Sequence, residues 1–265
     1  MTALGIRAVG VAAPGLPGWL ATADVLAGRA TFDAQRAVSL ASNLPGTERR
    51  RANDVSRWSI AAALEATSDA RAEDVAALAT VFGSADGDGH VLAAMLAALA
   101  EDKVTVSPTV FHNSVFNAPA GYWGIGAKAY ASSTTLCAGE GTFAAALLES
   151  YGLVTQTHEP VLLVVCDLPF PPRVPLTCGG RAPFAGALLL EACAENAPPL
   201  GRIDALHVTR SDERRPDREA LVDGEFAGNA SAAALLLLGA IARGRAAFVA
   251  LPYVDGAVVE LRWQP

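Results

Sequence analysis

Apolar positions along the chain follow two different periods. Residues 161–166 form an uninterrupted apolar run, and residues 187–191 are similar, as is typical of strands buried on both faces. Residues 54–66 and 142–153 instead place apolar side chains three and four positions apart, which predicts helices, the first with Asp54 as its N-cap. Strands that alternate with helices predict βαβ units and a sheet covered on both faces, which is an α/β fold.

Weaker patterns complete the expected order of elements. Apolar and β-branched composition predicts further strands at 5–12, 75–82, 129–136, 247–251 and 257–263. Helical spacing predicts further helices at 90–100 and 231–243. Residues 83–89 are rich in glycine and aspartate and predict a turn, and the mixed charges of 211–219 predict a surface loop. Asp255-Gly256 is a hairpin signal between the last two strands.

The composition is that of a folded protein with an acidic surface. Of the 265 residues, 52% are hydrophobic and 18% are charged, which excludes a disordered chain. The net charge of −7 argues against a nucleic-acid partner, because phosphate binding relies on clustered Lys and Arg. The exception is the short basic run Arg49-Arg50-Arg51, which suits either a solvated helix entry or an acidic partner protein.

Targeting and metal-binding patterns are missing from the sequence. The first residues lack a signal-peptide pattern, and the longest apolar segment, 230–241, is too short to span a bilayer, so we expect a cytoplasmic protein without membrane contact. The cysteines have neither C-x-x-C nor paired histidine spacing: Cys137, Cys166, Cys178 and Cys193. No phosphate-binding Gly-Lys-Ser/Thr follows the glycines of 83–89. We therefore expect no metal, disulfide or cofactor.

One cysteine, Cys137, has a context that suits a nucleophile. It follows the expected strand at 129–136 and precedes the expected helix at 142–153. The partial positive charge of a helix N-terminus favours the thiolate, and the small residues at 138, 139 and 141 would let a substrate approach. The alternative interpretation is a small thiol packed in the core.

Several motifs, in this order, resemble the β-ketoacyl synthases, which are condensing enzymes of the thiolase fold. Residues 9–15 (Val-Gly-Val-Ala-Ala-Pro-Gly) are similar to their first strand and Pro-Gly turn, and residues 47–51 (Thr-Glu-Arg-Arg-Arg) to their arginine-rich entry into the first long helix. Residues 134–139 are similar to their nucleophile turn, with Cys137 at the cysteine. Residues 181–191 resemble their Arg-Pro-Phe segment and the strand that follows it.

This resemblance implies a thiolase-like fold with an incomplete second half. Residues 1–210 would form the ketosynthase N-terminal domain, and residues 211–265 a truncated C-terminal remnant packed on the same core. Complete ketosynthases carry two catalytic histidines in the second half, in His-Gly-Thr and Asn-x-x-Gly-His motifs. This chain has four histidines, none of them in such a motif: His90, His112, His158 and His207. Their absence indicates that another subunit performs the chemistry.

Residues 108–123, together with the Leu-Cys-Ala turn at 136–138, resemble a narrower group. These are the short ketosynthase-like proteins described as chain-length factors of aryl-polyene clusters, which pair with an active ketosynthase in type II polyketide systems. The resemblance implies a cognate ketosynthase as partner, and contact with an acyl carrier protein through that complex. It assigns a role in the acyl tunnel or subunit interface to Phe111, Phe116, Asn117, Tyr122, Trp123 and Thr134. Core packing is the alternative for each aromatic residue.

Two other hypotheses stay open at this point. The chain is an acyltransferase that uses Cys137 as nucleophile and His112 as base, or it is a self-associating scaffold of the thiolase fold. A shift of one residue would put Ala138 at the nucleophile position, and an inward-pointing Glu140 would raise the pKa of a nearby thiol. Because ketosynthases pair through the strand before the nucleophile turn, here 130–135, dimerisation alone does not separate a scaffold from a chain-length factor.

Overall fold

The computed structural model describes residues 3–101, 105–171, 180–193, 200–210 and 215–265. Within these ranges the strands form one mixed nine-stranded sheet, ordered β4-β3-β5-β6-β1-β7-β9-β8, with β2 paired to β1. β3 is parallel to β4 and β5, and the other neighbours are antiparallel. The strands are β1 (Leu4–Ala13), β2 (Leu16–Pro17), β3 (Ala79–Gly83), β4 (Ser133–Leu136), β5 (Val161–Asp167), β6 (Phe184–Ala192), β7 (Arg202–Thr209), β8 (Ala247–Pro252) and β9 (Val258–Gln264).

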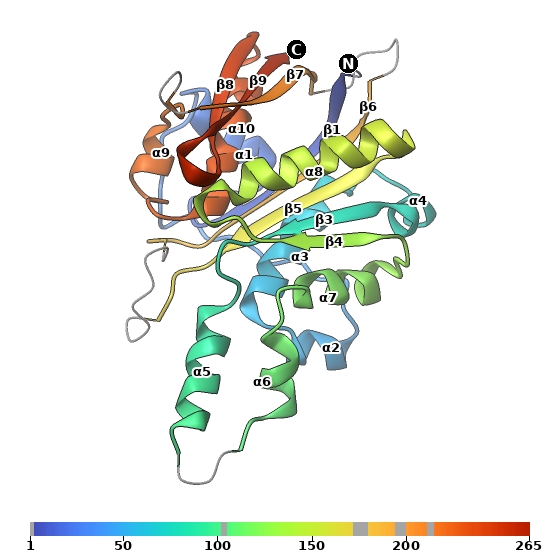
Figure 1. The fold of residues 1–265 in the computed structure, drawn as a ribbon, viewed down its shortest axis with the longest axis vertical. Coiled ribbons are helices and arrows are strands. Elements are labelled where there is room, and N and C mark those ends of the chain that lie inside the picture. Colours follow the sequence, from blue (N-terminus) through green and yellow to red (C-terminus); the bar gives the residue numbers. More distant parts are fainter. Residues whose placement is uncertain (1–2, 102–104, 172–179, 194–199, 211–214) are drawn as a thin grey trace.

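Helices cover both faces of the sheet around β5 and β6 (Figure 1). α8 and α10 lie on one face, with α1 against α10, and α3 and α7 lie on the other. The helices are α1 (Trp19–Leu26), α2 (Gly46–Arg51), α3 (Asp54–Ala66), α4 (Ala72–Ala77), α5 (Gly89–Leu99), α6 (Pro108–Asn113), α7 (Ala118–Ala127), α8 (Thr142–Thr157), α9 (Ala220–Asp223) and α10 (Ala234–Arg243), with 3₁₀ turns η1 (Gly139–Gly141), η2 (Ala230–Ala233) and η3 (Val254–Gly256).

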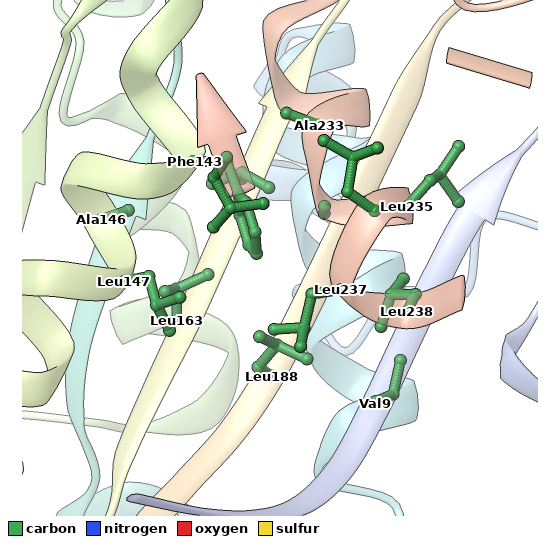
Figure 2. Close-up of a cluster of buried hydrophobic side chains, with 14 of the residues drawn as sticks. Val9, Phe143, Ala146, Leu147, Leu163, Leu188, Ala233, Leu235, Leu237 and Leu238 are labelled. Atoms are coloured by element: carbon green, nitrogen blue, oxygen red, sulfur yellow. The ribbon is translucent and has the colours of Figure 1, made fainter. Parts of the chain in front are cut away.

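The apolar run of β5 is buried on both sides, as its sequence predicts. Its odd-numbered apolar residues belong to the cluster under α8 and α10, and its even-numbered ones to the cluster under α3 and α7. Successive strand side chains point to opposite faces, so an uninterrupted apolar run needs cover on both. Figure 2 shows the first cluster, where Phe143 and Leu147 of α8 and the leucines of α10 meet Leu163 of β5 and Leu188 of β6.

α3 packs unusually close to β1. A side-chain carbon at Gly10 would overlap the carbonyl oxygen of Ala62, so only glycine fits there. One turn later along α3, the Glu65 carboxylate accepts hydrogen bonds from the backbone N–H of Val11 at 2.8 Å and of Trp19 at 2.6 Å. This carboxylate ties α3 to the turn between β1 and α1, where the backbone would otherwise lack partners.

Most predicted elements are confirmed within a few residues, and two details are wrong. The segment 75–82 is not one strand, because α4 covers its start and β3 begins at Ala79. Glu73 and Asp74 in the first turn of α4 favour a helix there, which the apolar pattern did not reveal. The N-cap of α3 is Asn53 rather than Asp54, since the Asn53 side chain accepts from the backbone N–H of Ser56, three residues on.

The C-terminal strands extend the same sheet. β7, which has no counterpart among the predicted strands, pairs with β1 at Leu4 and Ile203, and β9 and β8 follow. Asp255 and Gly256 both have left-handed φ angles, 53° and 73°, which confirms the hairpin turn between β8 and β9. Trp263 of β9 lies in the same buried cluster as β1. The division between 1–210 and 211–265 stays a prediction.

α5 and α6 project away from the sheet as an arm (Figure 1). The arm is apolar but largely exposed: the exposed fractions are 51% for Leu96, 54% for Leu99 and 62% for Phe111. Such a concentration of exposed apolar side chains is typical of an interaction surface. In the part of the chain that the structure describes, no helix is both long and apolar enough to cross a membrane.

Candidate functional site

The carboxyl ends of three neighbouring strands meet at one end of the sheet. β4, β3 and β5 run parallel, so the residues at their ends lie next to one another: Cys137 after β4, Ser84 after β3, and Asp167 as the last residue of β5. In open α/β sheets, ligands bind outside this end of the strands. This is therefore the region where a functional site is expected.

Cys137 lies in an exposed turn between β4 and α8. Its Sγ donates a hydrogen bond to the carbonyl oxygen of Ala85, at 2.8 Å. The next residues form a tight turn, with Gly139 at a φ of 53° and the Thr142 hydroxyl donating to the Gly139 carbonyl at 2.7 Å. The predicted strand–thiol–helix arrangement is confirmed, and the thiol is hydrogen-bonded to the loop after β3.

The β8–β9 hairpin packs against the start of α8. Gly141 is buried, and a side chain there would collide with the backbone of Tyr253 and Val254 beside η3. The thiol turn is thus held between the loop after β3 and the β8–β9 hairpin, which are distant in sequence. Only a residue without a side chain permits this approach at position 141.

Asp167 accepts several hydrogen bonds at this end of the sheet. Its buried carboxylate accepts from the Ser84 hydroxyl (2.8 Å), the Ala85 N–H (2.8 Å), and both the N–H (3.0 Å) and hydroxyl (2.6 Å) of Ser231. Its backbone carbonyl accepts from the Asn229 amide at 2.9 Å. Burial raises the pKa of Asp167, and these hydrogen bonds oppose the rise. Asp167 therefore links η2 of the C-terminal segment to the loop that holds the Cys137 thiol.

The structure places His112 and Cys137 in different surroundings. His112 is exposed on α6 and its ring packs edge-on against Tyr122, with 5.7 Å between the ring centroids. A cavity of about 290 Å³ beside it is also lined by Glu48 and Arg51 of α2. Among the described residues, no hydrogen bond joins the imidazole to the thiol, whose partner is a backbone carbonyl. Glu140 is exposed, and among the described residues it makes no hydrogen bond to the thiol.

The predicted tunnel or interface residues fall into two groups. Phe111, Phe116 and Asn117 are exposed, and Thr134 is half-buried in β4. The other two are core residues: Tyr122 and Trp123 are each 1% exposed and pack in the cluster under α3 and α7. Burial raises the pKa of Tyr122, and the neighbouring Asn113 side chain opposes this rise.

Two hollows flank this region. A partly enclosed cavity of about 150 Å³ lies where the arm joins the body, lined by the loop 84–88, by Leu92 and Met95 of α5, and by Asn53, Val55, Asn113, Ser114, Val115, Phe116 and Pro119. An open groove of about 400 Å³ runs between α7 and β4, lined by Asn117, Ala120, Gly121, Gly124, Ile125, Ala129, Tyr130, Ser133 and Thr135. We call these the root cavity and the edge groove. Of the predicted residues, the first contains Phe116 and the second Asn117.

Sequence reasoning missed two residues of this region, Asp167 and Asn113. Asp167 ends the otherwise apolar run of β5, and a carboxylate in that position was the available signal. Asn113 is 6% exposed, and its burial cannot be read from the polar sequence around it. The described residues hold no cluster of three or more His, Cys, Asp or Glu that is arranged to bind a metal ion.

Comparison with known proteins places this geometry in a family. Residues 20–227 match the model of the β-ketoacyl synthase N-terminal domain. A chain of the ketosynthase ApeO in complex with its chain length factor ApeC, from Xenorhabdus doucetiae, is 26% identical, with a TM-score of 0.71 and all of both chains covered. Among curated protein sequences none matches.

Two further solved structures share the fold. The ishigamide ketosynthase/chain length factor is 14% identical with a TM-score of 0.75. A type II polyketide synthase complex of an acyl-carrier protein with its ketosynthase, AntDE:AntF, is 12% identical with a TM-score of 0.76. In both cases 99% of each chain is covered. Because the family model spans most of the sequence and the structural likeness spans all of it, the chain belongs to the β-ketoacyl synthase N-terminal domain family, with a thiolase-like α/β fold.

Proposed function

We propose that this chain is a non-catalytic partner of an active β-ketoacyl synthase, a chain-length factor of a type II polyketide or aryl-polyene system. The full-length likeness to a chain of a ketosynthase–chain length factor complex supports this role. So does the site itself, where the Cys137 thiol is bound to a backbone carbonyl and has no histidine hydrogen-bonded to it among the described residues. The chemistry would then belong to the partner subunit.

The observation that carries the proposal is the outer edge of β4. The backbone N–H of Thr80 donates to the Ser132 carbonyl, and that of Ser84 donates to the Leu136 carbonyl. The even-numbered residues from 132 to 136 therefore direct their backbone N–H and C=O groups towards β3. In a parallel pair of strands, the odd-numbered residues of β4 then direct their backbone N–H and C=O groups away from β3. Among the residues that the structure describes, Ser133 and Thr135 therefore present a backbone edge with no strand paired to it, which is a template for a strand of another chain.

The surroundings of this edge fit a protein interface. The edge groove beside it has a floor of small residues on α7, where a side chain at Gly121 would meet no atom within 4 Å. Ile125 is 48% exposed on the same groove, and Tyr130 at its rim is 93% exposed. A strand paired to β4 would bring a partner helix or loop over these apolar side chains, which bury well only in a complex.

An acyl carrier protein would meet the complex at the basic end of α2. Arg49 and Arg50 are exposed, and among the described residues neither guanidinium has an ion pair, whereas Arg51 pairs with Glu48 at 3.5 Å. They are exposed positive charges on a chain of net charge −7. They suit the acidic surface expected of a carrier protein, with an effect mainly on association rate and salt dependence.

Co-expression with the cognate ketosynthase tests the proposal. The full chain is expected to co-purify with the ketosynthase, to elute with it in size exclusion, and to be required for the normal polyketide product. Ile125→Asp, in the edge groove, should weaken the complex at least tenfold, because it buries an unpaired charge. Leu20→Asp is the matched control, since Leu20 is 82% exposed on α1, outside the groove.

Three outcomes would count against this role. A chain that stays alone, while the ketosynthase makes its normal product without it, would remove the chain-length factor proposal. A thioester on Cys137 after incubation with acyl-carrier substrates would instead favour the acyltransferase hypothesis. A stable homodimer that forms in the presence of the ketosynthase, with no effect on product, would favour the scaffold.

A further inference from the structure

α7 separates the buried core from the edge groove. On its inner side, Tyr122 and Trp123 are fully buried and pack in the cluster under α3 and α7. On its outer side, Ile125 is half-exposed and lines the edge groove. Any molecule that binds in this groove therefore contacts one face of a helix whose opposite face is packed in the core.

Unpaired buried polar groups gather at this helix. Among the described residues, five buried side-chain atoms make no hydrogen bond, and the fifth of these, Arg202 Nε, still lies 2.7 Å from the Asp204 carboxylate in an ion pair. The other four are on α7 or beside it: Tyr122 Oη, Trp123 Nε1, Asn113 Oδ1 and Asn43 Oδ1. Buried polar groups without partners cost free energy and are few in native proteins. Four of them at one helix indicate that it has a second position in which they are satisfied.

The four groups are complementary. The Tyr122 hydroxyl and the Trp123 indole N–H donate, and the two asparagine oxygens accept. The Asn113 side chain affects the pKa of the Tyr122 hydroxyl, although the two groups are not in hydrogen-bond geometry. Asn43 Oδ1 lies against Gly126, where a side-chain carbon would overlap it, and position 126 is one turn from Trp123 on the same face of α7. Each donor therefore has an acceptor beside it to which it is not bonded.

The construction of α7 allows a small movement. Positions 121, 124 and 126 are glycine, which stabilises a helix less than alanine does. At Gly121 a side-chain carbon would meet no atom within 4 Å, so packing does not require glycine there. The helix ends at Lys128, with a left-handed φ of 54° in a region where glycine is usual. The Asn113 amide nitrogen, in contrast, is fixed by a 2.8 Å hydrogen bond to the Arg51 carbonyl, so α7 is the part that moves.

We propose that α7 has two positions, and that a partner docked in the edge groove shifts it to the one in which Tyr122 donates to Asn113 and Trp123 donates to Asn43. Helix shifts of about 1–2 Å at subunit interfaces are a common switching step. Packing within the chain favours the first position, and contacts with the partner on the outer face of α7 favour the second. The partner is the ketosynthase, and this part of the inference rests on the proposed function.

Tyr122→Phe in the chain alone tests the first position. The hydroxyl has no partner there, so its removal should leave the melting temperature unchanged or raise it. Ser150→Ala is the contrasting variant: it removes a buried hydroxyl that donates to the Ala146 carbonyl at 2.8 Å, and it should lower the melting temperature. A fall of more than about 2 °C for Tyr122→Phe would mean that protein or water already satisfies the hydroxyl, and would overturn the inference.

Ketosynthase binding by the same variant tests the second position. Tyr122→Phe should weaken the complex about tenfold, because one hydrogen bond of the docked state is lost, although Tyr122 is buried and does not line the edge groove. Tyr151→Phe is the matched control, since Tyr151 packs against the other buried cluster, and it should leave the affinity within about twofold. Equal affinities of wild type and Tyr122→Phe would overturn the inference.

NMR of the indole N–H groups follows the second hydrogen bond directly. The Trp123 signal should move downfield when the ketosynthase is added, whereas the Trp263 signal should stay in place, since its Nε1–H already donates to the Leu200 carbonyl at 3.1 Å. A Trp123 signal that does not move in a complex that forms would overturn the inference and leave the pairing of the two proteins intact. A wild-type chain that fails to bind the ketosynthase would remove the proposed function, and with it the docking step of this inference.

Discussion

The two edges of the sheet are built in opposite ways. At the β8 edge, Asp217 pairs with Ala250 through two hydrogen bonds: its backbone N–H donates to the Ala250 carbonyl at 2.8 Å, and its carboxylate accepts the Ala250 N–H at 3.1 Å. Pro252 ends that strand without an N–H to offer. At the β4 edge, Ser133 and Thr135 face outward beside the edge groove.

This difference indicates that the β8 edge is protected against pairing and that the β4 edge is suited to assembly. Proteins block exposed strand edges with charges, prolines and covering segments, because an open edge pairs with other chains. At β8, Asp217 supplies a charged residue that covers the edge and Pro252 supplies a proline, and the described residues place neither on β4. The apolar arm of α5 and α6 projects beyond the sheet on the side of β4 (Figure 1). We infer that a partner adds to the β4 edge.

The largest expected effect concerns Asp167, which links η2 to the loop after β3. Asp167→Ala should lower the free energy of unfolding by about 3 kcal/mol or more, because it leaves buried donors of Ser84, Ala85 and Ser231 without an acceptor. Chemical denaturation monitored by circular dichroism measures this. Asp24→Ala is the control: Asp24 is exposed and paired with Arg29, so its loss should cost less than about 1 kcal/mol.

The same carboxylate predicts a pH dependence. Burial raises its pKa, so the folded chain holds this proton more tightly than the unfolded chain does. Its contribution to the free energy of unfolding should therefore fall as the pH rises from the ordinary aspartate value to the raised one. Asp167→Asn, which does not titrate, should lack this slope. A wild-type slope of the opposite sign in that range would show that the hydrogen bonds outweigh burial.

The next effect tests the β4 edge directly. Thr135→Pro should weaken ketosynthase binding at least about 100-fold, or about 2.7 kcal/mol, because proline removes an outward N–H and obstructs strand pairing. The fold should survive, since that N–H does not bond to β3. Phe248→Pro makes the matched change on the β8 edge and should leave binding intact. Titration by isothermal calorimetry measures both, and equal losses would remove the distinction between the edges.

A smaller effect is expected when the protected edge is opened. Asp217→Ala should cost about 1 kcal/mol of stability, since the Ala250 N–H loses its acceptor. The exposed edge should also make the chain self-associate as its concentration rises. Size exclusion over a range of concentrations checks this, with Asp223→Ala, an exposed carboxylate paired to Arg218, as control. A variant that stays monodisperse would mean that Asp217 does not protect this edge.

The smallest effect is expected at the thiol. Cys137→Ala removes one hydrogen bond to Ala85 from an exposed side chain, and on the proposed function it should change neither ketosynthase binding nor product amount by more than about twofold. Binding and product analysis of the co-expressed complex provide the measurement. A loss of product with ketosynthase binding unchanged would favour the hypothesis that Cys137 is a nucleophile.

The sequence predicted the elements whose patterns are local. The apolar run of β5 and the helical spacing of α3 and α8 require a particular burial, so they could be read directly. β7 was not predicted, because its burial alternates irregularly along the strand and its neighbour β9 lies about 55 residues later. The strand–thiol–helix context of Cys137 and the β-ketoacyl synthase resemblance were also visible, since both are carried by short consecutive motifs.

Tertiary structure alone decided which groups meet. That Asp167 accepts from Ser231, 64 residues away, and that Asn113 is buried with an unpaired oxygen, depends on how the ends of β3 and β5, η2 and α6 converge. Protection of β8 by Asp217 and exposure of β4 are likewise properties of strand order, which no local pattern encodes. The sequence by itself determined the α/β layers and the family, because burial periodicity and short motifs are both local in the chain. The contacts of Asp167, the root cavity and the open edge of β4 arise only when segments distant in the sequence pack together.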